Sequence, residues 1–70
     1  MDTRRVARKS LHAAAEIPAG TTIEPSHVDV VRPADGLSPR ALERVVGAVA
    51  LEDIPAGEPI VERAVDADPD

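Results

Sequence analysis

The sequence repeats itself once, at an offset of 37 positions. Residues 13–23, AAAEIPAGTTI, align with residues 50–60, ALEDIPAGEPI, and the consecutive residues Ile-Pro-Ala-Gly are the same in both. The register continues to Val28-Asp29, which align with Val65-Asp66. Two copies are too few for an open solenoid, which needs three or more repeats. The sequence therefore predicts one small domain built from two similar half-units related by a pseudo-twofold axis.

The chain is 70 residues long and contains no Phe, Trp or Tyr. This length allows one domain with one core. Because aromatic side chains are absent, the core must be built from Val, Ile, Leu and Ala. The side chains that we expect in the core are Leu11, Ala13, Ile17, Ile23, Val28, Val30, Leu37, Leu42, Val45, Val46, Val49, Leu51, Ile54, Ile60 and Val65.

Each copy of the repeat has the pattern of a tight turn between two short extended segments. The Pro of Ile-Pro-Ala-Gly sets φ for the turn, and Gly20 or Gly57 can take the positive φ that a tight turn often needs. Pro25 suits the first position of a short helical turn. The residues from Val28 onward then form a strand-like stretch that closes at Arg32-Pro33. Because proline does not fit a central strand, we expect the strands to be short or at edges.

The segment between the two copies predicts the one clear helix of the chain. Ser38 is a good N-cap, Pro39 is a good first helical residue, and Gly47 is a good C-terminal stop. Three apolar residues have the i, i+3, i+4 spacing of one helix face: Leu42, Val45 and Val46. The expected fold class is therefore mostly β, with tight turns and a helix of about two turns.

The two ends of the chain differ from its middle in charge. The first residues are basic, and we interpret residues 1–7 as a flexible leader or a linker stub. Residues 66–70, Asp-Ala-Asp-Pro-Asp, predict a disordered acidic tail. Residues 8–65 remain as the folded domain.

The composition excludes several classes of function. A net charge of −5 argues against generic nucleic-acid binding, which needs a basic surface. No apolar segment approaches the roughly 18 residues that a membrane span needs. Without Cys, the chain has neither disulfides nor thiolate chemistry. We therefore expect a soluble cytoplasmic domain with no nucleic-acid or membrane partner.

Residues that could support catalysis or bind a metal are few. Ser10 and Ser38 have no evident His–acid relay, and Ser38 is explained as a helix cap. We expect His12, in a strand-like run, to face solvent or to pack, while His27 lies beside a turn. No metal-ligand spacing accompanies either histidine. The sequence thus predicts neither a catalytic residue nor a metal site.

Arg32 is the one polar residue for which the sequence suggests a possible ligand contact. It ends a Val-rich stretch and is followed by Pro33, which restricts the local backbone. A guanidinium presented in this way can pair with a carboxylate or donate to a carbonyl with directional geometry. From the residues alone, a surface salt bridge is the ordinary role of Arg32, and a ligand contact is the alternative.

These features together resemble the SAF, or antifreeze-like, domain. The resemblance rests on RKSL at residues 8–11, on the two Ile-Pro-Ala-Gly turns and on VVRPADGLSP at residues 30–39, and it covers about residues 8–65. The Arg-Pro-x-x-Gly-Leu-Ser-Pro stretch is most similar to the C-terminal domain of N-acetylneuraminate (sialic acid) synthases. Ala34 stands where those enzymes typically have Gly.

The resemblance implies a β-clip fold, a pretzel-like and pseudo-twofold arrangement of short strands. It implies a partner, the (β/α)8 barrel of another synthase subunit, which condenses phosphoenolpyruvate with an N-acylated amino sugar and uses a divalent metal. In the family this domain caps the partner's barrel, and an Arg of the Arg-Pro segment contacts the N-acyl group of the sugar. The matching residue is Arg32, so the resemblance implies a substrate-binding residue but no catalytic residue, cofactor or metal in this domain. It implies no catalysis by the domain alone.

Two other functions belong to proteins of the same fold. A stand-alone SAF module would bind carbohydrate or act as a chaperone-like protein. Ice binding, the function of the fish type III antifreeze proteins, is disfavoured because Glu16, Glu24 and His27 interrupt the small side chains of the matching surface. We predict no meaningful thermal hysteresis, and hysteresis comparable to that of a true antifreeze protein would contradict this prediction.

Overall fold

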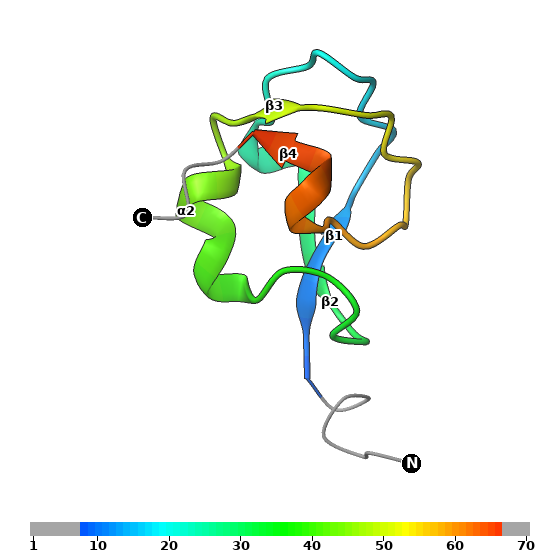
Figure 1. Cartoon of the computed structure of the whole chain (residues 1–70). Helices are drawn as coiled ribbons and strands as arrows, with labels where there is room; N and C mark the ends of the chain where they lie inside the picture. The colour runs from blue at the N-terminus through cyan, green and yellow to red at the C-terminus, as the bar shows by residue number, and fades with distance from the viewer. Residues whose placement is uncertain (1–7, 67–70) are drawn as a thin grey trace.

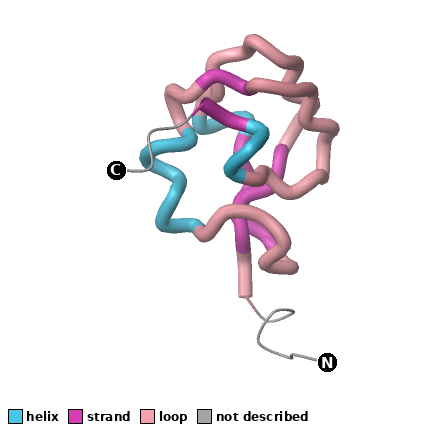
Figure 2. Tube along the Cα trace, viewed as in Figure 1, coloured by secondary structure: helices cyan, strands magenta, loops and turns pink. Residues whose placement is uncertain are grey.

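The computed structural model describes residues 8–66. The expected leader at residues 1–7 lies outside the described residues, and so does the expected acidic tail apart from Asp66, which belongs to the last strand. Short elements joined by long loops make up the chain (Figure 2), so the mostly-β class with short helical turns is confirmed. Their order is β1 (Ser10–Ala13), the 3-10 turn η1 (Pro25–His27), β2 (Val28–Val31), η2 (Pro39–Ala41), α2 (Leu42–Val45), β3 (Val49–Ala50), η3 (Glu62–Ala64) and β4 (Val65–Asp66).

The strands form two small antiparallel ladders. β1 pairs with β2 from Ser10–Val31 to Ala13–Val28, whereas β3 pairs with β4 only at Val49–Asp66 and Ala50–Val65. In Figure 1 the β3–β4 ladder lies at the top, the β1–β2 ladder runs down from it, and α2 stands to one side. The two ladders are thus separate sheets and not one continuous surface.

Ile17 and Ile54 lie where the two half-units meet. The N–H of each donates to the carbonyl oxygen of the other at 2.8 Å, as expected for two equivalent residues that face each other across a twofold axis. Other backbone hydrogen bonds occur in equivalent pairs at the same offset: Gly20 to Ala50 with Gly57 to Ala13, Ala50 to Thr21 with Ala13 to Glu58, and Ala14 to His27 with Leu51 to Ala64. The predicted pseudo-twofold repeat is confirmed.

The turn of each copy has the backbone that its residues predict. Gly20 has φ of +88° and Gly57 has φ of +86°, a region in which residues with a Cβ are strained. Thr21 N–H donates to Pro18 O and Glu58 N–H donates to Pro55 O, both at 3.1 Å, and each bond closes its turn.

The predicted helix is present as η2 followed by α2. Ser38 is its N-cap, because the Ser38 hydroxyl accepts a hydrogen bond from the N–H of Arg40 at 3.2 Å. Pro39 is the first residue, as predicted. Gly47 follows the helix with φ of +93°, and its N–H donates to Ile23 O at 2.7 Å, which ties the end of the helix to the core.

The core is aliphatic and draws on both half-units. Its buried apolar side chains are Leu11, Ala13, Ile17, Ile23, Ala41, Val45, Ala48, Ala50, Ile54, Ile60, Ala64 and Val65. Val28, Leu37 and Leu42 are partly buried and pack against this cluster, and Val46 is half-buried.

Three residues that we predicted to be in the core are exposed instead. Val30, Val49 and Leu51 have 38%, 37% and 58% of their surface exposed. Successive side chains of a strand point to opposite faces, so the burial of Ala50 turns Val49 outward. Val30 belongs to β2, where no residue is buried, because β2 borders the molecule and only β1 enters its interior.

Candidate functional site

The segment that carries Arg32 folds back over β1. We call residues 32–37 the Arg-Pro loop; it is the green loop that follows β2, to the lower right of α2 in Figure 1. The Arg32–Pro33 peptide bond is cis. At the far end of the loop, Leu37 accepts a hydrogen bond from the N–H of Leu11 at 2.9 Å and donates to Ile60 O at 2.8 Å. The loop is therefore bound to β1 of the first half-unit and to Ile60 of the second.

Two buried polar side chains of β1 lie under this loop. Ser10 is 0% exposed and His12 is 6% exposed. The Ser10 hydroxyl donates to Pro33 O at 2.9 Å and accepts the N–H of Gly36 at 3.1 Å. Nε2 of His12 lies 2.9 Å from the same Pro33 oxygen, and Nδ1 lies 3.3 Å from Gly57 O. Both side chains thus contact the loop backbone, since residues 10 and 12 share one face of the strand.

Gly36 lets the loop approach β1 closely. A Cβ at this position would lie 2.7 Å from Ile60 O and 2.8 Å from Leu11 O, and both are backbone atoms that cannot move aside easily. The requirement for glycine here comes from the close approach of three backbone segments.

Arg32 is the first residue after β2, at the start of this loop. Its side chain is exposed, and it follows Val30 and Val31, which are 38% and 42% exposed. The position agrees with the expected end of the strand-like stretch. The role in substrate binding that the sequence analysis gives to Arg32 stays a prediction.

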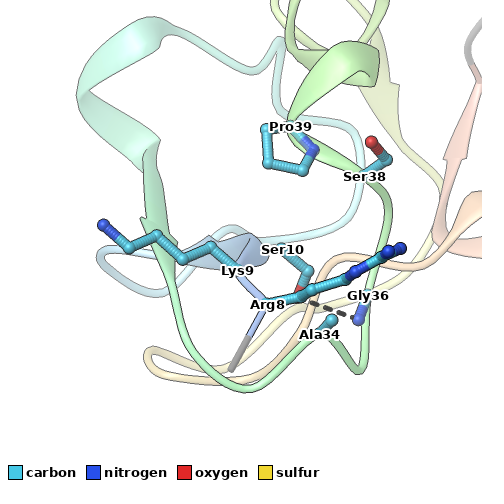
Figure 3. Close-up of a pocket in the computed structure, with 7 residues that line it drawn as sticks. All are labelled: Arg8, Lys9, Ser10, Ala34, Gly36, Ser38 and Pro39. Atoms are coloured by element: carbon cyan, nitrogen blue, oxygen red, sulfur yellow. Dashed lines mark hydrogen bonds between the residues drawn. The ribbon is translucent and has the colours of Figure 1, made fainter. Parts of the chain in front are cut away.

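A surface pocket of about 360 Å³ borders the loop (Figure 3). Figure 3 shows Ser10 between the Arg8 and Lys9 side chains, which point in opposite directions. Their two positive charges therefore do not converge on one point of the pocket. The lining residues are Arg8, Lys9, Ser10, Ala34, Gly36, Ser38 and Pro39.

The other polar residues named in the sequence analysis have structural contacts. Ser38 caps the helix, and Nδ1 of His27 accepts a hydrogen bond from the N–H of Glu24 at 2.9 Å. Within residues 8–66, no three His, Asp or Glu side chains gather in a way that could hold a metal ion. No helix in this part of the chain is long and apolar enough to cross a membrane.

The contact of Ser10 and His12 with the loop was not predicted from the sequence. The available signal was two polar residues at i and i+2 in a predicted strand, which share a face. That spacing is equally typical of a solvent-facing strand edge, so the path of the loop was needed to find the site.

Two half-units of short strands, related by a pseudo-twofold axis and closed by tight Pro–Gly turns, place the chain in the β-clip class of folds. The model of the SAF domain family matches residues 8–65, and the chain belongs to that family. Among solved structures, it is similar to an antifreeze-protein-like domain of the human N-acetylneuraminic acid phosphate synthase gene. That match has a TM-score of 0.81 and 26% identity, and it covers 91% of this chain and 82% of that chain. No curated protein sequence matches the chain.

Proposed function

We propose that this SAF domain caps the active site of a sialic-acid-type synthase barrel on a partner subunit and contributes Arg32 to the N-acyl group of an amino sugar. The observation that carries the proposal is the position of Arg32, exposed at the start of a loop whose backbone is bound to the core at Pro33, Gly36 and Leu37. Membership of the SAF family and likeness to the human synthase-gene domain support it.

The chemistry of the side chain suits the proposed ligand. A guanidinium has five N–H donors and keeps its charge throughout the physiological pH range. The carbonyl oxygen of an N-acyl group is an acceptor, and a hydrogen bond from a charged donor is stronger than one from a neutral donor. Arg32 would therefore favour an N-acylated sugar over the free amine, which is a cation at neutral pH.

The surface beside Arg32 suits a partner protein. Val30 and Val31 are both more than a third exposed on β2, so apolar area lies directly next to the arginine. Covering these valines with the rim of a barrel would remove apolar surface from water and exclude water from the Arg32 contact. Docking and sugar binding would then reinforce each other.

The domain does not perform the condensation by itself under this proposal. Phosphoenolpyruvate and the divalent metal would bind on the barrel, because the described residues offer no cluster of ligands that fits a metal ion. The task of this chain is to bind and orient the sugar and to close the site.

A domain exchange tests the proposal. This chain replaces the antifreeze-like domain of a sialic acid synthase, and Arg32→Ala is compared with Arg63→Ala, which removes an exposed arginine of η3 that is not part of the loop. We expect Arg32→Ala to raise KM for the N-acylated sugar about tenfold, the loss of one charge-assisted hydrogen bond, and to leave KM for phosphoenolpyruvate unchanged. Arg63→Ala should change neither.

Equal kinetics for the Arg32→Ala variant and the parent would reject the role of Arg32. A second measurement uses the 70-residue chain alone, with an N-acetylated amino sugar and the same sugar without its acetyl group as titrants in NMR. Shifts centred on residues 32–38 with the acetylated sugar only would favour direct sugar contact, and shifts with neither sugar would favour a scaffold role.

A further inference from the structure

We propose that Ser10 and His12 are positioning residues, which hold the Arg-Pro loop on β1 and thereby fix the direction in which Arg32 leaves the domain. The inference rests on the proposed function of Arg32 and adds to it the side chains that orient this arginine. It starts from two buried polar groups that the fold itself does not require.

The Ser10 hydroxyl forms hydrogen bonds with two backbone groups of the loop. Its Oγ donates to Pro33 O at 2.9 Å and accepts from Gly36 N–H at 3.1 Å, the bond drawn in Figure 3. The hydroxyl thus has partners at both ends of the Pro33–Gly36 stretch. With Ser10 fully buried, loss of the hydroxyl would leave loop groups without their partner, which is costly in the interior.

His12 holds the same carbonyl and extends the contact to the second half-unit. The ring nitrogens face two carbonyl oxygens, and a ring with one N–H donates to only one of them; Nε2 lies 2.9 Å from Pro33 O, the shorter of the two contacts, so we assign the proton to Nε2. The ring also lies 3.0 Å from Ser10 Oγ, and its Nδ1 lies 3.3 Å from Gly57 O. The imidazole therefore packs between the loop and the turn of the second repeat.

These contacts end one residue from Arg32. Pro33 restricts its own φ, and its carbonyl has two side-chain partners, so little freedom remains at the base of the arginine. The backbone hydrogen bonds of Leu37 with Leu11 and Ile60 hold the other end of the loop against the strand. A side chain that leaves a fixed base loses less conformational entropy on binding.

The second half-unit shows that the fold forms without this polar pair. The residues equivalent to Ser10 and His12 are Gly47 and Val49, and Val49 pairs with Asp66 while 37% exposed. The ladder there closes without a buried serine or histidine. The polar pair occurs only in the half-unit whose strand lies under the Arg-Pro loop, which assigns it to the loop.

The first experiment measures the loop in the 70-residue chain. Ser10→Ala is compared with Ser26→Ala, an exposed serine of η1, by amide hydrogen exchange. We expect the Gly36 amide to exchange about tenfold faster in Ser10→Ala, because it loses its acceptor. The Ile54 amide should keep its rate in both variants. Unchanged Gly36 exchange in Ser10→Ala would overturn the proposal.

His12→Val places at position 12 the residue of the equivalent position 49, and His12→Gln keeps a side-chain N–H donor. The 15N relaxation of the Arg32 side-chain Nε reports on its mobility. We expect His12→Val to make Arg32 as mobile as Arg63 and His12→Gln to restore most of the order. Equal mobility of Arg32 in His12→Val and the parent would contradict the role of His12, and the pair of variants remains informative if Ser10→Ala does not fold.

Kinetics of the synthase that carries this domain test whether the loop contacts affect sugar binding. Ser10→Ala should raise KM for the amino sugar several-fold with little change in kcat, and the double variant with Arg32→Ala should be no worse than Arg32→Ala alone. Additive effects would contradict positioning through Arg32. If Arg32→Ala alone leaves KM unchanged while Gly36 exchange responds to Ser10→Ala, the proposed function fails and the anchoring of the loop stands.

Discussion

The first half-unit, residues 10–31, and the second, residues 47–66, follow a similar backbone course but differ in their first strands, β1 and β3. β1 pairs along its whole length with β2 and is buried at every residue, whereas β3 has only two residues, one of them exposed. Buried Ser10 and His12 of β1 align with Gly47, in the turn before β3, and with Val49 of β3. The shared features, the Ile-Pro-Ala-Gly turns and the isoleucine pair, therefore build the fold, and the differing features support the Arg-Pro loop.

The largest expected effect comes from the pair that the half-units share. Ile17 and Ile54 are 0% and 3% exposed, so Ile17→Ala and Ile54→Ala should each lower the free energy of unfolding by about 2–5 kcal/mol. The two losses should be similar, because the sites are equivalent. Urea unfolding followed by far-UV circular dichroism measures them, since the chain has no aromatic residue for fluorescence.

The matched controls are Ile17→Val and Ile54→Val, which should lose about 0.5–1.5 kcal/mol each. A large loss at one position and a negligible loss at the other would mean that the two half-units do not contribute equally to the core, and the symmetric account of the fold would be wrong.

Gly36 has no counterpart in the shared architecture and should show the next largest effect. Gly36→Ala would place a Cβ 2.7 Å from Ile60 O and 2.8 Å from Leu11 O, and should lower the free energy of unfolding by about 1–3 kcal/mol. We also expect the amide shifts of residues 33–37 to change more than those around Ile54. A fully tolerated alanine would show that the loop can lift from β1.

The repeat carries most of what the sequence could predict about the fold. Equivalent Pro and Gly residues predict equivalent turns from local conformational preferences alone, and Gly20 and Gly57 indeed have φ within 2° of each other. The helix start at Ser38 and Pro39 is also a local property. Such features depend on neighbours in the chain, and for this reason they were found.

The incorrect core predictions concern which side chains face the interior of the domain. Val49 was expected in the core, yet it is 37% exposed, while its neighbours Ala48 and Ala50 are 7% and 1% exposed. The backbones of Ala48 and Ala50 are hydrogen-bonded to Ile23, Thr21 and Gly20 of the first half-unit, so the burial of these alanines depends on contacts between residues far apart in the sequence. The candidate site shows the same limit, since the bonds from Ser10 to Pro33 and Gly36 span 23 and 26 residues.

Substitutions of the two turn glycines, Gly20 and Gly57, should have similar and smaller effects on the free energy of unfolding. Apart from the glycine and its two chain neighbours, no atom lies within 4 Å of a Cβ built on Gly20 or Gly57, so an alanine there meets strain from positive φ and no clash. Gly20→Ala and Gly57→Ala should each cost about 1–2 kcal/mol. Gly20→Asn and Gly57→Asn, which tolerate this backbone better, should cost less in the same urea titration. A larger loss for Asn than for Ala would contradict strain as the cause.

Asp53 and Glu16 should show the smallest difference between the half-units. Asp53 Oδ1 accepts a hydrogen bond from Ala19 N–H at 2.8 Å, and thus holds the turn of the first half-unit, whereas among the described residues Glu16, at the equivalent position, has no such bond to the second turn. Asp53→Ala should cost about 0.5–1.5 kcal/mol because the bond is exposed to solvent. Glu16→Ala should stay within about 0.5 kcal/mol of the parent. Equal losses would mean that the longer Glu16 side chain supports the second turn in solution, and that the half-units are more alike in their turns than in their central strands.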